Sequence, residues 1–407
     1  MKVIVQKFGG RSLINDELRR AAAAQVKRAL NTGQTPVVVV SALGRYGDPY
    51  ATDTLIQLMR KVHDRPSARS LDLLMSCGEI IAAALFAEEL MAGGLVAVAL
   101  TGWQSGIYTD ERHGEAFVDR IDTARLLTEI GAGRIPVVTG FQGLSPSGEV
   151  TTLGRGGSDT TAAALGVALE AGWIEIFTDV DGVKTADPAI VPDAGTIAAL
   201  TYQEVVELAH LGAKVIHPRA VEIAMEKGIP LRIRSVNDSY GGTTIGGRGR
   251  SQIKELAAIG DRVVAGIAHM GHRAKVQIDG CADFNASGMA LQVFRRLAES
   301  DVSVDLIYLS TDRIGFIVDS DKAATTQQVL DRLALKSRVE SGYAKVSVVG
   351  AGMHGVPGVM ARIVACLETI GVPILQTTDS HANISCLIHE EYLSSAVSAL
   401  HKEFHLS

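Results

Sequence analysis

The chain has 407 residues, of which 47% are hydrophobic, 5% aromatic and 21% charged, and its formal net charge is −6. This length suits two or three domains, and the negative balance argues against nucleic acid or an anionic membrane surface as the main partner. The four cysteines form no CxxC pair, the amino terminus carries no signal-peptide core, and no apolar run approaches the roughly 20 residues of a membrane helix. We therefore expect a soluble, cytoplasmic protein.

The first part of the chain alternates hydrophobic runs with helical stretches, which is typical of a parallel α/β sheet. Such sheets bind ligands at the carboxyl ends of their strands, where Lys7 and Ser41 lie. A lysine there can supply charge to phosphate oxygens, and a solvated lysine is the alternative. Residues 106–119 are expected to be irregular. The predicted strands are 3–8, 36–41, 96–100, 135–139, 173–178 and 230–235, and the predicted helices are 16–30, 68–90, 203–211 and 219–227.

The most distinctive stretch is 151–164, TTLGRGGSDTTAAA, in which three glycines precede an alanine-rich helical run. Glycine permits positive φ and a close approach of the backbone to a ligand, and such a loop at a helix start directs N–H groups toward an anion. The alternative is that Ser158 or Asp159 serves only as the N-cap. The stretch is not a Walker loop, because the G-K-[ST] ending is missing.

Two further polar features accompany these elements. Gly78 and Glu79 lie inside the predicted helix 68–90, where glycine costs about 1 kcal/mol relative to alanine and indicates close packing or a nearby ligand. Glu79 among apolar neighbours suits a cationic group such as an α-ammonium, and a solvent-facing glutamate is the alternative. The loop 178–188, TDVDGVKTADP, does not meet the spacing of a calcium loop, so we interpret it as a nucleotide-binding loop at the sheet edge.

The tail contains an internal repeat with an offset of 70, in which Ala274-Lys275-Val276 recurs as Ala344-Lys345-Val346. Each copy is predicted to have the order strand, loop, helix, strand, strand and helix, which is the order of a small ferredoxin-like βαββαβ unit. Such a pair after an enzyme domain indicates regulation, and purely structural oligomerisation modules are the alternative. The predicted helices are 286–299, 323–335, 358–370 and 392–401.

Several motifs together resemble the aspartate kinase family, namely KFGG at 7–10, GRGGSDTTA at 154–162, FTDVDGV at 177–183, TADP at 185–188 and GAKVIHPR at 212–219. The tail is similar to that family's tandem ACT domains. The segments 44–53 and 350–359 are most similar to the monofunctional, diaminopimelate-linked Bacillus-type isozyme. The resemblance implies an α/β fold with an amino-acid-kinase domain over 1–236, a linker over 237–260, and ACT domains over 261–340 and 341–407.

The resemblance also implies the reaction, which is transfer of the ATP γ-phosphoryl group to the β-carboxylate of L-aspartate. The product, 4-phospho-L-aspartate, leads to diaminopimelate, lysine, threonine and methionine, with feedback regulation through the ACT domains. Catalysis of this kind is mostly positioning and charge neutralisation. Lys7 is expected to neutralise phosphoryl charge, Asp159 to organise lysines and glycine amides, Glu79 to hold the substrate ammonium, and Arg155 to clamp the α-carboxylate.

Three sets of binding residues follow from the motifs. The substrate set is Ser41, Thr52, Glu79, Arg155, Gly156, Gly157 and Ser158. The nucleotide set is Lys7, Phe8, Gly9, Gly10, Ser158, Thr178, Asp179, Val183, Lys184, Thr185, Asp187, Pro188 and Lys214. The effector set is Asp283, Ser287, Gly288, Val356, Pro357 and Gly358.

The implied co-substrate is ATP with Mg²⁺, and the ion rides mainly on phosphates and waters, so no protein metal ligand is named. The expected effector is diaminopimelate first, then lysine or threonine, and the expected assembly is a homodimer or homotetramer through the ACT domains. Neither nucleic acid nor a membrane is an expected partner.

Three positions depart from the family pattern. Arg11 stands where threonine is usual, Ala189 where arginine is common and Lys184 where tyrosine is frequent. Two rival functions remain at this point. One is another amino-acid kinase, such as an acetylglutamate or glutamate kinase, which lacks a tandem ACT tail of this kind. The other is a catalytically weak amino-acid sensor or assembly subunit, supported only by Arg11 and Ala189.

Overall fold

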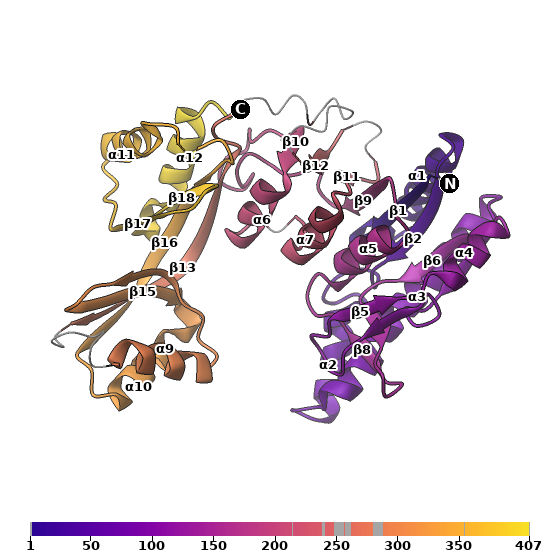
Figure 1. Cartoon of the computed structure of the whole chain (residues 1–407), viewed down its shortest axis with the longest axis horizontal. Helices are drawn as coiled ribbons and strands as arrows, with labels where there is room; N and C mark the ends of the chain where they lie inside the picture. The colour runs from indigo at the N-terminus through magenta and orange to yellow at the C-terminus, as the bar shows by residue number, and fades with distance from the viewer. Residues whose placement is uncertain are drawn as a thin grey trace. The chain divides into compact units, whose positions relative to one another are not determined.

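The structure is a computed structural model that describes residues 2–213, 215–237, 241–247, 256, 262–279, 288–353 and 355–406. The chain forms two compact units, which are treated separately (Figure 1). The first comprises Met1–Val183, Thr196–Ala209 and Lys214–Gly260. The second comprises Lys184–Gly195, His210–Ala213 and Asp261–Ser407.

The first unit is built on an eight-stranded sheet with the order β10-β12-β11-β9-β1-β2-β6-β3. Neighbouring strands are parallel except for β11 and β12, which form an antiparallel pair. All six strands predicted for this part of the chain are present, so the expectation of an α/β sheet is confirmed. The bounds are β1 Val3–Phe8, β2 Thr35–Val40, β3 Ala97–Leu100, β6 Ile135–Thr139, β9 Trp173–Thr178, β10 Ala199–Thr201, β11 Leu231–Ser235 and β12 Thr243–Gly246.

Helices cover both faces of this sheet, and β1 shows how the side chains are divided between them. Phe8 packs in a core with Val26 of α1 and Phe86 of α3, whereas its neighbour Lys7 faces α5, because successive side chains of a strand point to opposite faces. The helices are α1 Asp16–Asn31, α2 Thr52–Val62, α3 Ala68–Ala92, α4 Ala124–Gly131, α5 Gly157–Ala168, α6 Tyr202–His210 and α7 Pro218–Lys227, and a 3-10 turn spans Gly10–Leu13.

A second, four-stranded sheet was not predicted. Its order is β5-β4-β7-β8, with β4 Ile107–Thr109, β5 Val118–Ile121, β7 Gln142–Leu144 and β8 Val150–Thr152. The expectation that 106–119 is irregular is therefore wrong, since the segment holds β4 and the first residues of β5. Strands of three or four residues are too short to show a period of two in the sequence.

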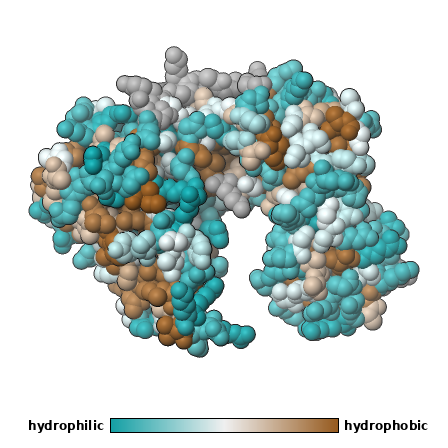
Figure 2. Space-filling view, turned by 180° about the vertical axis from the view of Figure 1, so that it is seen from behind, coloured by the Kyte–Doolittle hydropathy of each residue, from teal (hydrophilic) through white to brown (hydrophobic). Residues whose placement is uncertain are grey.

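Helix α3 is, among the described residues, the one helix long and apolar enough to cross a membrane by length and composition alone. Half of its most apolar stretch is buried, and Ala82, Phe86 and Leu90 are fully buried against the sheet. Its apolar composition thus matches a helix packed into a core. On the face shown in Figure 2, small groups of apolar residues lie among hydrophilic ones in both units.

The second unit is built on a six-stranded sheet with the order β14-β15-β13-β16-β18-β17. The repeat inferred from the sequence reappears in the structure at the same offset of 70, since α9 spans Met289–Glu299 and α11 spans Val359–Thr369. Val293 and Ile363 are buried at equivalent positions in the two copies. The other elements are β13 Gly266–Asp279, β14 Asp305–Leu309, β15 Arg313–Asp319, β16 Ser337–Val349, β17 Gln376–Asp379, β18 Asn383–His389, α10 Ala323–Arg332, α12 Leu393–Glu403 and 3-10 turns at Ser320–Lys322 and Glu390–Tyr392.

The long strands β13 and β16 run through both copies. The first part of β13 pairs with the last part of β16, where Gly266 is opposite Val349, and its second part pairs with the start of β16, where Ile278 is opposite Ser337. Each copy therefore shares its central strands with the other. The segment Lys184–Gly195 also belongs to this unit, and its Ala186 lies in the same core as β16.

Candidate active site

A cavity of about 460 Å³ lies in the first unit, at the carboxyl ends of β1 and β2 and beside the start of α5. It contains every residue predicted to bind the substrate, although these come from segments far apart in the sequence. Its lining also includes three predicted nucleotide residues, Lys7, Gly10 and Ser158, of which Ser158 belongs to both sets. The full lining is Lys7, Gly10, Ser41, Ala42, Gly44, Thr52, Asp53, Ile56, Met75, Glu79, Gly114, Phe141, Gly154, Arg155, Gly156, Gly157, Ser158 and Asp159.

An ion pair stands at the centre of this lining. The Lys7 ammonium lies 2.7 Å from Asp159 Oδ1, and both side chains are almost buried, at 11% and 12% exposure. Asp159 Oδ2 also accepts a hydrogen bond from the backbone N–H of His217 at 3.4 Å. Strand β1 and helix α5 thus hold one positive and one negative charge against each other at the cavity wall.

Glycine is required at positions 154 and 156 of the central stretch, 151–164, for steric reasons. Gly156 precedes α5 with φ of +72°, and a Cβ there would lie 2.3 Å from the side chain of His217. Gly154 also has positive φ, +73°, so a side chain at either position would be strained. Gly157 and Ser158, the first residues of α5, line the cavity, so the positive end of the helix dipole lies at its wall and favours anions.

Glu79 is a buried carboxyl group on α3, only 2% exposed. Its Oε1 accepts a hydrogen bond from Ala42 N at 2.9 Å, whereas its Oε2 has no hydrogen-bond partner among the residues that the structure describes. Burial raises the pKa of Glu79 to about 8, against the lowering effects of the Ala42 hydrogen bond and the Lys7 charge. A buried carboxyl oxygen without a partner at a cavity wall is suited to a cationic ligand group.

Gly78, next to Glu79, is explained by close packing. A Cβ at Gly78 would lie 2.8 Å from both Ala42 Cβ and the carbonyl oxygen of Tyr50. The segment after β2 therefore lies directly against α3, which brings Ala42 within hydrogen-bond distance of Glu79.

Arg155 is exposed, and it forms no hydrogen bond or ion pair with the part of the chain that the structure describes. Its guanidinium group therefore keeps all five N–H donors for a ligand. Arg11 differs, because its guanidinium group pairs with Asp179 Oδ2. Burial alone would raise the pKa of Asp179, but the hydrogen bonds from Arg11 and Thr178 outweigh it and lower the pKa.

Comparisons with known proteins show the family to which the chain belongs. The model of the amino acid kinase family matches residues 2–235, and an ACT domain model matches residues 338–402. Aspartokinase 1 of Bacillus subtilis is 43% identical over 407 residues, which is 100% of both chains. The aspartokinase of Geobacillus stearothermophilus is 41% identical over 413 residues, covering 100% of this chain and 98% of that protein.

The chain belongs to the aspartokinase family. Among solved structures, E. coli aspartokinase III in complex with aspartate and ADP has a TM-score of 0.78 at 26% identity, with 99% of each chain covered. The same enzyme in complex with lysine and aspartate has a TM-score of 0.76 at 26% identity, with coverage of 99% and 100%. The resemblance stated from the sequence motifs is confirmed, and the activity is that of an ATP-dependent aspartate kinase with ACT-linked regulation.

Not all of the nucleotide residues expected from the aspartokinase motifs line the cavity. Phe8 has a fully buried side chain stacked on Phe177 with ring centroids 4.7 Å apart, so only its backbone remains for contact with a ligand. Gly9 donates its N–H to Phe177 O at 3.0 Å. Val183 is buried and donates its N–H to Thr243 Oγ1 at 2.8 Å.

The aspartokinase TADP motif, residues 185–188, belongs to the second unit. Thr185 Oγ1 is hydrogen-bonded to His401 Nε2 of α12 at 2.8 Å, and Thr185 O accepts from Ile267 N at 2.7 Å. Asp187 Oδ1 accepts from Ala189 N at 2.9 Å, next to Pro188. Lys184 is in the same unit. The assignment of these residues to the nucleotide site stays a prediction, and their described contacts are structural.

Three of the predicted residues, Lys214, Asp283 and Ser287, lie outside the described residues. Of the effector set, Gly288 precedes α9 with φ of +67° and Gly358 precedes α11 with φ of +93°. Val356 and Pro357 are exposed in the turn before Gly358. In both copies of the repeat a glycine with positive φ thus directly precedes the first helix.

Several lining residues were not found by sequence reasoning. Phe141 has φ of +71° and donates its N–H to Thr161 Oγ1 at 3.0 Å, and its position after β6 was the only available signal. Asp53 lies in the first turn of α2, a helix that is not among those predicted from the sequence. Gly114 comes from the segment that was expected to be irregular.

Proposed function

We propose that this cavity binds L-aspartate and the phosphates of ATP and that the phosphoryl transfer takes place between Lys7 and Arg155. The observation that supports this most strongly is the shared wall of the cavity, which holds the Lys7–Asp159 ion pair, the start of α5 and the partnerless Oε2 of Glu79. These groups offer two positive regions for anions and one carboxyl group for an ammonium. An amino acid with two carboxylates and a polyphosphate together require that combination.

In this proposal each end of aspartate has its own partner. The ammonium pairs with Glu79, and the α-carboxylate takes two parallel hydrogen bonds from Arg155, which is free to make them. The β-carboxylate then lies toward Lys7. One of its oxygens forms the new bond to the γ-phosphorus while the bond to the ADP oxygen breaks. No general base is needed, because the nucleophile is already ionised at neutral pH.

Lys7 and the N–H groups of α5 then neutralise charge on the transferring group. Asp159 keeps the Lys7 ammonium in place through its 2.7 Å contact, so it acts on the lysine and not on a proton of the substrate. Preorganised charges of this kind do not need to reorient during the reaction, which is the main source of catalysis in phosphoryl transfer.

The residues present fit a Mg²⁺ ion that is carried by the nucleotide. Among the described residues there is no group of three or more His, Cys, Asp or Glu side chains that could hold a metal ion. Asp159 of α5 and Asp179, which follows β9, are already paired with Lys7 and Arg11. Mg²⁺ bound mostly by phosphates and waters would shield the charge of the polyphosphate, and needs only one or two protein oxygens.

We further propose that the enzyme acts in the cytoplasm, early in the route to diaminopimelate, lysine and threonine, and that it forms homo-oligomers through its second unit. The repeated βαββαβ order of that unit supports an amino-acid effector site. The likeness to the Bacillus aspartokinases favours diaminopimelate over lysine and threonine, and the E. coli relative described in complex with lysine is the reason to test lysine as well.

The first test is aspartate-dependent ATP turnover by the purified chain, with the acyl phosphate trapped by hydroxylamine. We expect hydroxamate formation with aspartate and not with glutamate, and inhibition by one of diaminopimelate, lysine or threonine. Turnover with glutamate would favour the rival kinases. Binding of amino acid without any turnover would favour the regulatory subunit.

A further inference from the structure

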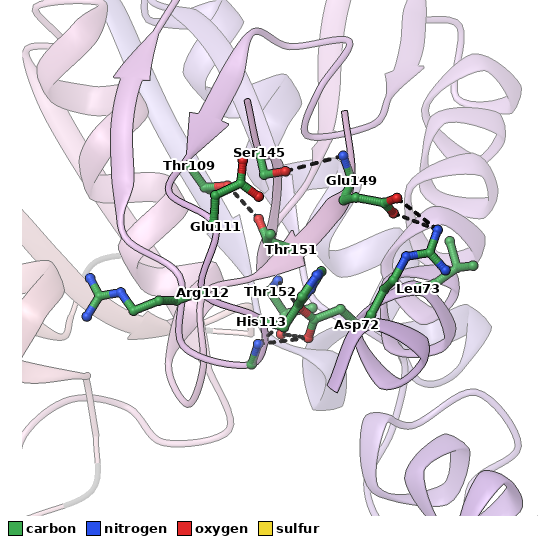
Figure 3. A network of polar contacts seen from close by, with 12 residues as sticks. Asp72, Leu73, Thr109, Glu111, Arg112, His113, Ser145, Glu149, Thr151 and Thr152 are labelled. Atoms are coloured by element: carbon green, nitrogen blue, oxygen red, sulfur yellow. Dashed lines mark hydrogen bonds and ion pairs between the residues drawn. The ribbon is translucent and has the colours of Figure 1, made fainter. Parts of the chain in front are cut away.

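A buried carboxyl group that lies outside the cavity bonds to two segments of the cavity wall. Asp72 of α3 is 0% exposed and does not line the cavity. It accepts hydrogen bonds from Thr152 Oγ1 at 2.6 Å, from Thr152 N at 3.2 Å and from Gly114 N at 3.0 Å. His113 Nδ1 lies 2.8 Å from Asp72 Oδ2. Figure 3 shows the Asp72 carboxyl group between His113 and Thr152.

Both partners lead directly into the cavity wall. Gly114 is itself a lining residue, and Thr152 ends β8 two residues before Gly154, where the central glycine stretch begins. The two segments also contact each other, because Ala116 N donates to Thr152 O at 2.9 Å. A Cβ on Gly154 would lie 3.2 Å from Gly114 O, so their spacing is tight. Asp72 therefore anchors two adjacent segments of the wall to one helix.

Asp72 and Glu79 occupy the same side of α3, since residues seven apart are separated by about two helical turns. Glu79 faces the cavity with a partnerless oxygen, whereas both oxygens of Asp72 are fully engaged by protein donors. One helix thus carries a carboxyl group for the ligand and a second one for the segments that enclose the ligand. The two roles are linked because both carboxyl groups are fixed to the same helix.

We propose that Asp72 is a positioning residue for aspartate binding, which fixes Gly114 and the strand leading to Gly154 and Arg155 relative to Glu79. This inference rests on the proposed function of the cavity. Its physical basis is that Arg155 has no described partner of its own, so its place relative to Glu79 is set by the backbone on either side. A shift of that backbone separates the two groups that hold the ends of the amino acid.

The main test is Asp72→Asn, which keeps the size of the side chain but places an N–H₂ group against at least one of the N–H and O–H donors. We expect the KM for aspartate to rise on the order of 10-fold or more, since displacements of about 1 Å can cost 10²-fold. The KM for ATP and the melting temperature should change little by comparison. A purely structural role would lower the melting temperature and the active fraction while leaving the KM for aspartate unchanged, and that result would overturn the proposal.

Two further variants separate positioning from general destabilisation. Glu149→Gln is the matched control, because Glu149 also joins the segment before β8 to α3, through a 2.8 Å contact with Arg69, but within the described residues has no hydrogen bond to Gly114 or Thr152. Its KM for aspartate should equal that of the parent chain. Thr152→Val removes the 2.6 Å bond in a side chain of similar shape and should raise the KM in the same direction but less. Equal effects of Glu149→Gln and Asp72→Asn would contradict the proposal.

Amide hydrogen exchange followed by mass spectrometry makes the test independent of activity. Asp72→Asn should increase exchange in peptides that cover 111–116 and 151–157, whereas Glu149→Gln should leave these peptides unchanged. Unchanged exchange in both variants would overturn the positioning role. If the parent chain shows no aspartate-dependent turnover, the proposed function fails, and the exchange result still decides whether Asp72 holds the wall.

Discussion

The two units use buried charge in different ways. In the first unit, Glu79 is 2% exposed and one of its carboxyl oxygens has no hydrogen-bond partner. In the second unit, Lys345 of β16 is 5% exposed, and its ammonium group pairs with Asp305 of β14. A buried polar group without a partner costs roughly 1–3 kcal/mol. The first unit tolerates this cost at its cavity, where a ligand can supply the missing partner.

Two further pairs of buried polar side chains in the second unit also have their partners within that unit. Ser347 and Ser385 form a hydrogen bond of 2.7 Å across two neighbouring strands, and Thr185 bonds to His401 at 2.8 Å. These groups satisfy one another within the unit. The comparison teaches that the open carboxyl oxygen of Glu79 is a stronger pointer to a ligand than burial of a charge alone, because Lys345 is also buried but has its partner within the protein.

The largest expected effect concerns the paired charges at the cavity. Lys7→Ala and Asp159→Ala should each lower kcat by roughly 10³-fold or more, because the charge that faces the transferring group is lost or misplaced. Circular dichroism should show an unchanged fold. Lys345→Met, the matched change in the second unit, should leave kcat near that of the parent. Near-normal turnover of Lys7→Ala would mean that the buried lysine at the cavity matters no more for catalysis than Lys345 in the second unit.

A smaller effect is expected at Arg155. Lysine at this position keeps the charge but cannot form the two parallel hydrogen bonds of a guanidinium group. Arg155→Lys should therefore raise the KM for aspartate on the order of 10-fold with a smaller change in kcat. Steady-state kinetics with aspartate varied at saturating ATP measure this directly. An unchanged KM would place the α-carboxylate elsewhere in the cavity.

Because the pKa of Glu79 is raised, we expect the KM for aspartate to depend on pH. Below a pKa of about 8 the carboxyl group is increasingly neutral in the free enzyme, and only its charged form pairs with an ammonium. The KM for aspartate should therefore fall as the pH rises from 6 to 8, by at most about tenfold per unit. In Glu79→Gln the KM should be higher and nearly flat over this range. An equally steep profile in that variant would assign the titration to another group.

The sequence was sufficient to predict the main elements around the cavity and the repeat of the second unit. It was not sufficient to predict Asp72, and the physical reasons for the two outcomes differ. The strand that ends at Lys7 and the glycine stretch before Asp159 have strong local patterns, and the repeat of the second unit is visible as an offset. Asp72 carries no such pattern, because a single aspartate in a helix looks like a solvent-facing residue. Its partners are 41 and 80 residues away, so only the tertiary structure reveals them.

The smallest expected effect concerns Arg11 of the first unit. Its guanidinium group already has a partner, Asp179, just as the ammonium group of Lys345 has one in the second unit. Both side chains are about half exposed, at 49% and 40%, and such pairs contribute about 0–1 kcal/mol. Arg11→Thr should therefore leave kcat unchanged and alter the KM for ATP by less than about fivefold, because 1 kcal/mol corresponds to that factor. It should also return the pKa of Asp179 toward its usual range, which NMR titration of the carboxyl carbon can follow. A large loss of turnover would mean that Arg11 contacts the phosphates. The Arg11–Asp179 pair would then have to be grouped with the ligand-binding residues of the cavity.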